Sequence, residues 1–446
     1  MPRIFFLYFS SVIFFLSSQA YAWEGHYMLT YAALGAMPEL SVPSITPESL
    51  ESFLASEKNS LVTILKNYED WALKNIKSYP PLPKALIFDG KESAQSSLVK
   101  KFLMSIRVNP ELSFANFVVY APGMPHRIQN LFTPEERALD PVASLLKLRA
   151  DYPVVEKISN HDKVSALEVL ASASEEPDHG LDLGLWEDNQ SAYGKLMGFG
   201  MQPFGNPVVS YSSQAPFHMG FYHEKPFLYW VAGWLKRCFP EYRISLFLTL
   251  AQHAFATGHI YWGHRFLGWA LHYIQDLTQP YHATLAPGWS WLRLIALNAL
   301  EIMGIKTPAQ NLRQLLTNRH LTLENYEFES IRNIQSNELL QRALSDRSED
   351  KKYPEYYKNY PRKVVAEEAH SRANMIDGLI TKAFPSIYVL EPTHIFTGTD
   401  PSINMRDLAF KYNWLEAQKL EFEFLNRMRA YGSHTRNALK YILPKP

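Results

Sequence analysis

The segment from His272 to His282 constrains the fold of this chain more than any other. It places an imidazole at His272, a carboxylate at Asp276 and a second imidazole at His282. On an α-helix, residues four positions apart lie on one face, so His272 and Asp276 can hold one metal ion together. Pro280 has no backbone N–H and biases the residue before it away from helical geometry. We therefore expect Pro280 to stop the helix, so that His282 departs in a new direction and reaches a second metal ion.

Residues 1–22 are typical of a cleavable secretory signal. They contain an early arginine, an apolar run and the small-residue ending Ala20–Ala22. The apolar run is short for a bilayer span, which argues against an uncleaved membrane anchor. Cleavage would make Trp23 the new N-terminus, and its free amine and carbonyl oxygen could bind a metal ion close to His26. We therefore expect a secreted or periplasmic protein whose processing completes a metal site.

Two further segments contain candidate ligands between which the sequence leaves a choice. An acidic turn contains Asp178 and Asp182, and a later aromatic segment contains His218 and His223. A third segment contains His320 and Glu324, again four positions apart on an expected helix. Together these segments supply oxygen and nitrogen ligands without thiolate, which suits hydrolytic zinc.

These segments resemble the zinc-dependent phospholipase C and single-strand nuclease superfamily, whose mature proteins begin with tryptophan and bind three zinc ions. The matching residues follow the family's order and lie in alignable sequence that covers a third to a half of the chain. They are Trp23, His26, Asp178, His218, the segment from His272 to His282, His320 and Glu324. The chain departs from the family in having fewer residues between the tryptophan and its histidine.

The resemblance implies three zinc sites and the fold of the family. The first zinc would be held by Asp178, His218, His272 and Asp276; the second by His282, His320 and Glu324; and the third by Trp23 and His26, with Asp276 as a bridge.

The function implied by the resemblance is that of a secreted phospholipase C. Such an enzyme hydrolyses the glycerol-side phosphodiester of phospholipids such as phosphatidylcholine by attack of zinc-bound hydroxide, and Asp178 would be both a ligand and a general base. One alternative is a single-strand nuclease or 3'-nucleotidase with the same three zinc ions. A second alternative is a non-enzymatic binding protein that zinc stabilises.

Composition favours the lipid substrate over nucleic acid. Lys plus Arg and Asp plus Glu are balanced at 44 each, so the whole protein has no strong field that would attract a polyanion. Cys238 is the only cysteine and cannot form an intramolecular disulfide, whereas the fungal-type nucleases of the superfamily generally contain disulfides. Glu324 stands where the phospholipases typically have glutamate and the nucleases aspartate. We expect a phospholipid partner at a membrane surface and no stable protein partner.

Apolar residues recur at helical spacing around the candidate ligands, and strand-like alternation is scarce, with residues 115–120 as a short exception. We therefore predict an all-α fold for residues 23–446. Compared with the superfamily core, the chain contains insertions at about 40–170 and 284–316 and a C-terminal extension at about 335–446. The charged, tyrosine-rich stretch 345–363 is expected to be exposed.

The insertion at 284–316 contains an aromatic and aliphatic segment from Gly288 to Met303. One interpretation is a helix buried in an enlarged core. The other is an interfacial helix whose Trp289 and Trp291 enter the headgroup region of a membrane and bring the metal ions close to a lipid phosphate.

Overall fold

The computed structural model describes residues 25–92, 97–120, 124, 154–205, 212–398, 400 and 402–443. Trp23 and the expected signal at 1–22 lie outside these residues. Across the described residues the chain is helical, with a single two-stranded sheet, which confirms the all-α prediction. The longer helices before the site are α1 (His26–Leu34), α2 (Leu50–Asn75), α3 (Leu98–Ser105), α6 (Ala166–Glu175), α9 (Pro240–Ala256) and α10 (Ile260–Asp276). Those after it are α12 (Trp291–Ile302), α13 (Thr307–Ile331), α14 (Glu338–Ser345), α15 (Glu367–Ala383), α17 (Met405–Tyr412) and α18 (Trp414–Ile442).

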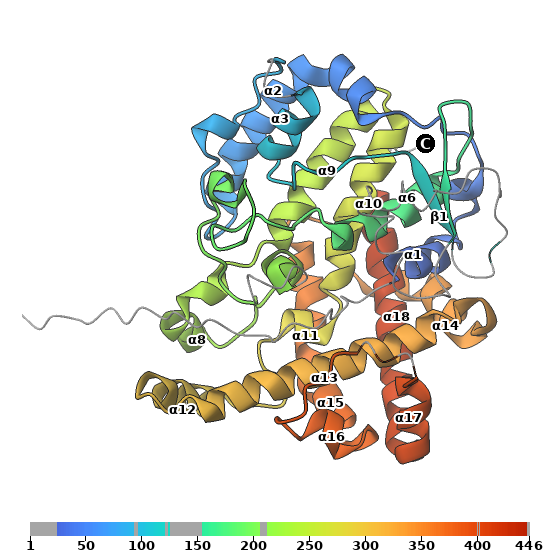
Figure 1. The fold of residues 1–446 in the computed structure, drawn as a ribbon. Coiled ribbons are helices and arrows are strands. Elements are labelled where there is room, and N and C mark those ends of the chain that lie inside the picture. Colours follow the sequence, from blue (N-terminus) through green and yellow to red (C-terminus); the bar gives the residue numbers. More distant parts are fainter. Residues whose placement is uncertain are drawn as a thin grey trace, which may run out of the picture.

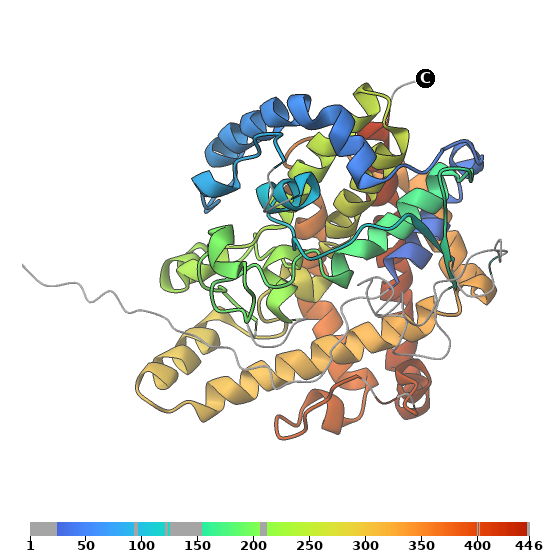
Figure 2. The same ribbon diagram turned by 45° about the horizontal axis from the view of Figure 1, so that its top comes forward.

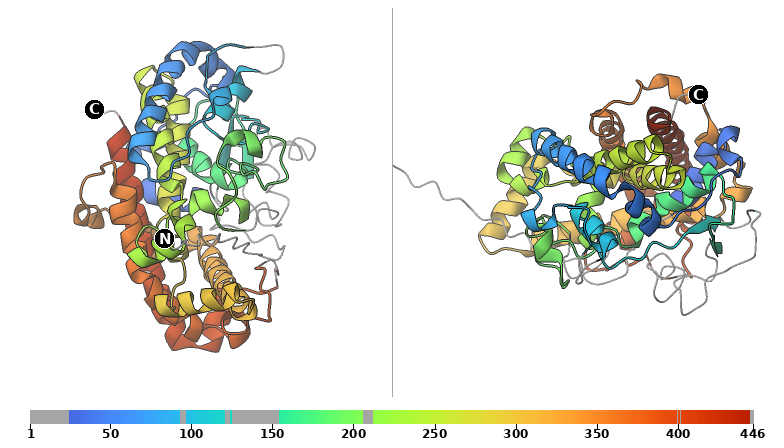
Figure 3. Two further views of the ribbon diagram at one scale, coloured as in Figure 1. Left: turned by 90° about the vertical axis from the view of Figure 1, so that its left-hand side faces the viewer. Right: turned by 90° about the horizontal axis from the view of Figure 1, so that it is seen from above.

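Helix α10 lies at the centre of the fold and packs against α9, α6 and α18 (Figure 1). Every residue from Tyr261 to Asp276 is buried, as expected for a helix with neighbours on all sides. In the left panel of Figure 3, α18 flanks one side of the α9–α10 pair and the green segments before residue 205 flank the other. The polar residues of α10 are therefore held in a rigid, dry setting.

The insertion before the site forms a helical layer and the small sheet. Helices α2 and α3 pack together, and α2 also contacts α9. The expected strand at 115–120 appears as β1 (Phe117–Tyr120), which pairs antiparallel with β2 (Val154–Lys157) and packs against α6. This sheet therefore supports the helix that leads to Asp178.

The C-terminal extension is part of the main core. Helix α18 contacts α1, α10, α14 and α15, and its buried residues belong to the same apolar cluster as those of α10. The stretch 345–363 is mostly exposed or half-buried, as expected, but Tyr356 and Tyr360 are buried. The extension therefore contributes directly to the surroundings of the site.

Helices α12 and α13 form a hairpin that extends from one end of the molecule (Figure 2). No residue of α12 is buried, so the interpretation of this segment as a core helix is wrong. The described part of the chain contains no helix with the length and hydropathy needed to cross a membrane.

Candidate metal centre

His272 and Asp276 lie on the last turn of α10, with Nε2 of His272 3.2 Å from Oδ2 of Asp276. The helix ends at Asp276, before Pro280, so the prediction that Pro280 stops it is wrong in position. Pro280 instead begins the one-turn helix α11 (Pro280–Ala283), where its missing N–H costs no hydrogen bond. His282 lies on this second helix and thus approaches Asp276 from a new direction, as expected.

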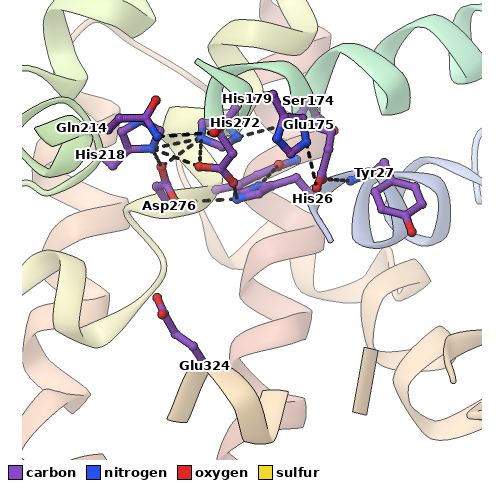
Figure 4. A network of polar contacts seen from close by, with 12 residues as sticks. His26, Tyr27, Ser174, Glu175, His179, Gln214, His218, His272, Asp276 and Glu324 are labelled. Carbon is purple, nitrogen blue, oxygen red and sulfur yellow. Dashed lines mark hydrogen bonds and ion pairs between the residues drawn. The ribbon is translucent and has the colours of Figure 1, made fainter. Parts of the chain in front are cut away.

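Asp276 is fully buried at the centre of the cluster, where Figure 4 shows it beside His26, His218 and His272. Its Oδ2 lies 2.8 Å from Nδ1 of His218, while its Oδ1 lies 3.4 Å from Nδ1 of His282 and 3.6 Å from Nε2 of His26. One carboxylate therefore faces histidines from α1, α10, α11 and the short helix α7 (Ala215–His218).

Asp178 reaches the cluster from the short helix η3 (Glu176–His179), which continues α6 and ends at Gly180 in the left-handed conformation. Its Oδ1 lies 3.6 Å from Nε2 of His272 and 3.7 Å from Nδ1 of His218. The rival Asp182 instead accepts a hydrogen bond from the Tyr273 hydroxyl at 2.7 Å and forms an ion pair with a buried arginine. Asp178 is therefore the aspartate whose carboxylate faces both His272 and His218, while Asp182 lies against the outer ring nitrogen of His218.

The choice between the two histidines is equally clear in the structure. His218 is buried within the cluster, whereas His223 is half-buried and lies against the carbonyl oxygen of Arg362, 2.7 Å from its Nε2. His223 belongs to none of the ligand groups that the described residues form.

His320 and Glu324 lie on one face of α13, with Nε2 of His320 2.8 Å from Oε1 of Glu324. The same oxygen lies 3.5 Å from Nε2 of His282. The ring of Tyr281 stacks on His320 with an interplanar angle of 8°, and its hydroxyl donates to Asp377. This stacking holds the His320 ring in place.

Three groups of side chains could each hold a metal ion. They are His26 with His272 and Asp276; Asp178 with His218 and His272; and His282 with His320 and Glu324. The structure thus brings together every predicted ligand except Trp23, which lies outside the described residues. These side chains, all buried except half-buried His320, could therefore hold metal ions.

The unsatisfied polar atoms of the cluster fit bound cations. Both carboxylate oxygens of Asp178, Oδ1 of Asp276, Nδ1 of His282 and Oε1 of Glu324 are buried without a hydrogen bond. Buried polar atoms in proteins are almost always hydrogen-bonded, and leaving one unsatisfied is costly. Zinc in hydrolytic sites is bound by the lone pairs of imidazole nitrogens and carboxylate oxygens, and atoms of both kinds converge here.

The electrostatics of the cluster also favour a cation. Burial lowers the pKa of His218, but Asp276, Asp182 and Asp178 outweigh it and raise that pKa to about 10. Burial likewise lowers the pKa of His282, while Asp276 and Glu324 raise it to about 9. Burial raises the pKa of Asp276, yet the nearby imidazoles hold it well below the usual range of a carboxyl. The carboxylates thus create a negative potential at which protons and metal ions compete.

Polar groups around the cluster orient His26, His218 and His272. Most of these polar groups were not predicted from the sequence. His26 Nδ1 lies 2.9 Å from Oε1 of Gln275, and His272 Nδ1 lies 2.8 Å from the carbonyl oxygen of Ser174. Nε2 of His218 lies 3.3 Å from Asp182. In each case one ring nitrogen faces an acceptor and the other is turned towards Asp276, which is the usual support of metal-binding histidines. Among these supporting residues, Gln275 is the one whose role its sequence position could have indicated, because it lies between the predicted ligands His272 and Asp276.

A cavity of about 300 Å³ adjoins the cluster. Asp178, His218, His282, His320 and Glu324 form one end of it. Most of the remaining lining is apolar and comes from α12, α13 and residues 204–205 and 212–235. His26, His272 and Asp276 lie beneath this surface, fully buried.

Comparison of the chain with family models, with curated proteins and with solved structures finds no match.

Proposed function

We propose that this protein is a zinc-dependent phosphoric diester hydrolase of the phospholipase C type. The proposal rests on the observation that three adjacent ligand groups lie at one apolar cavity. Asp276 and His272 connect two of the groups, and His282 brings the third within 3.4 Å of Asp276. We infer three zinc ions, the third of them held by His26, Asp276 and the amino terminus at Trp23.

Zinc ions at these positions would lower the pKa of a water molecule and offset negative charge on phosphate oxygens. The protein's own contribution to the reaction lies in Asp178, whose two oxygens accept no hydrogen bond and whose side chain borders the cavity. It would take a proton from the attacking water as the water oxygen bonds to phosphorus and the bond between phosphorus and the glycerol oxygen breaks, and that proton would then pass to the departing glycerol oxygen. The products would be diacylglycerol and a phosphorylated headgroup.

The lining of the cavity favours a lipid over a nucleic acid. Among the described lining residues, Arg313 is the only lysine or arginine, and its guanidinium is paired with Glu301 at 2.8 and 3.0 Å. Proteins that bind single-stranded nucleic acid combine a positive groove with aromatic stacking platforms. A cavity without a free cation matches the uncharged part of a lipid instead.

Exposed aromatic residues near the cavity support contact with a membrane surface. Trp291 is 41 % exposed and Trp230 is 79 % exposed. The ring of Phe227 lies between them, with its centroid 6.1 Å from that of Trp291 and 5.6 Å from that of Trp230. We call Phe227, Trp230 and Trp291 the aromatic rim. Trp289, the other tryptophan of the expected interfacial helix, is half-buried beneath the guanidinium of Arg293. The rim therefore pairs α12 with α8 (Pro226–Val231), and aromatic residues of this kind favour the headgroup region.

The test is an assay of the processed protein, with zinc and with chelator, on phosphatidylcholine vesicles and on single-stranded DNA in parallel. We expect chelator-sensitive release of phosphocholine and no release of nucleotides. Asp178→Asn should lose activity by at least about a hundredfold, whereas Asp70→Asn on the exposed face of α2 should retain it. Nucleotide release without phosphocholine would overturn the lipid assignment, and full zinc occupancy without either activity would indicate a zinc-stabilised binding protein.

A further inference from the structure

The cavity beside the metal centre extends well beyond the residues that could hold metal. Its walls are the α12–α13 hairpin on one side and residues 204–205 and 212–235 on the other. A phosphate group needs only the end formed by Asp178, His282 and Glu324. The rest of the volume must accommodate another part of the ligand.

One face of α13 runs along the whole cavity. Ala309, Leu312 and Leu316 line its far part, and His320 and Glu324 line its metal-binding end. These positions recur at intervals of three and four, which places them on a single stripe of the helix. At a rise of about 1.5 Å per residue, Ala309 lies roughly 16 Å along the axis from His320. The apolar part of the stripe is thus long and narrow.

The opposite wall is a small apolar cluster separate from the main core. Its buried members that line the cavity are Phe204, Phe221, Leu228 and Ala232, and Ile295 of α12 packs against the cluster. The far part has one charged pair, Glu301 with Arg313, in which each charge neutralises the other. Such a lining gives no site for a charged headgroup and removes hydrocarbon from water.

We propose that this cavity binds one hydrocarbon chain of the lipid substrate, with the phosphate at the Asp178–Glu324 end. This inference rests on the proposed function for the identity of the phosphate-bearing end. The hydrocarbon chain would lie along the α13 stripe, so the affinity for the substrate would depend on the length of its acyl chain. If the cavity instead bound the headgroup, the affinity would depend on the headgroup and not on acyl length.

The test compares hydrolysis of dibutyryl and diheptanoyl phosphatidylcholine, both as dissolved monomers, by the zinc-loaded processed protein. We expect kcat/KM to rise by about fourfold for each methylene that enters the cavity, the ratio that corresponds to burying one such group. Ala309→Phe would fill the far part and should flatten this dependence. Gln310→Phe is the matched control, because it adds the same ring to the exposed side of the same helix. An unchanged chain-length dependence in Ala309→Phe would overturn the proposal.

A second variant and a binding measurement keep the test decisive. Leu297→Trp narrows the cavity from α12 and serves if Ala309→Phe does not fold, as judged by circular dichroism. Binding of an uncharged fluorescent polyene fatty acid methyl ester to the chelated protein reports the cavity without catalysis. If no phospholipid is hydrolysed but one ester binds per molecule and Leu297→Trp abolishes binding, the chain site stands and the proposed function fails. If the wild-type protein binds no ester, the chain site is refuted.

Discussion

The ion pair between Arg265 and Glu176 offers the sharpest test of how the turn that contains Asp178 is positioned. Arg265 lies on α10, and Glu176 begins the short helix η3. Their bond is bidentate, with Nε and Nη2 of the arginine donating to the two carboxylate oxygens at 2.8 and 3.0 Å. Both side chains are buried. Since Asp178 follows Glu176 by two residues, this pair fixes the turn to the central helix.

Arg265→Met would remove the bidentate partner of the buried Glu176 carboxylate. Removing one partner of a buried pair typically costs about 3–5 kcal/mol, because the remaining charge is uncompensated. Replacing both partners with apolar residues of similar volume is often close to neutral. The Arg265 guanidinium also lies 5.0 Å from the ring centroid of Trp262, and the double variant Arg265→Met/Glu176→Met loses this cation–π contact. We therefore expect the double variant to be about 1 kcal/mol less stable than the wild type.

Urea unfolding of the wild type, both single variants and the double variant measures this cycle. We expect each single variant to be several kcal/mol less stable than the double variant. Zinc affinity, measured against a fluorescent chelator, should fall by about 10–100-fold in Arg265→Met, because a residue beyond the ligands then loses its support. A double variant as unstable as the singles would refute the reasoning, since the cost would then lie in packing and not in the unpaired charge.

Three further predictions concern separate parts of the chain. Burial lowers the pKa of His264 to about 4, so its neutral form stabilises the fold above pH 6.5 and this contribution is lost as the pH falls towards 4. Between pH 7 and pH 4.5 the wild type should therefore lose about 2.5 kcal/mol more unfolding free energy than His264→Phe, and equal losses would contradict the assignment. Gln275→Leu should weaken zinc binding by about 10–100-fold in chelator competition because His26 loses its acceptor, whereas Gln275→Glu should largely preserve it. Trp230→Ala/Trp291→Ala should lower activity on vesicles by about tenfold or more and leave dissolved short-chain lipid unaffected; equal losses on both would exclude an interfacial function.

The parts of the site that could be predicted from sequence are those encoded by short-range spacing. His272 with Asp276, and His320 with Glu324, lie four residues apart, and helical geometry brings each pair together whatever the rest of the fold does. Asp178 was proposed through resemblance, and its three-dimensional contact with His272, within one ligand group that also contains His218, decides it over Asp182. No spacing rule connects positions that are forty residues apart.

The supporting residues escaped prediction for the same physical reason. The ion pair of Glu176 with Arg265 joins positions 89 residues apart, and neither residue differs in sequence from an ordinary surface charge. The exposure of α12 was equally hidden, because an apolar helix that borders a cavity has the composition of a core helix. Only the position of its neighbours decides between the two.

Helix α10 connects the ligands, their supports and the stability of the fold in one element. His272 and Asp276 face the candidate metal ions, while Gln275 holds His26 of α1 and Arg265 holds the turn that follows α6. The partners of α10 come from segments far apart in sequence, so the cluster forms only when these segments have docked on the helix. Cations bound there would therefore stabilise the docked arrangement itself, since binding that requires the folded state adds to its stability. In a chain whose single cysteine is buried and unpaired, this coupling would supply the cross-links that disulfides provide in other proteins.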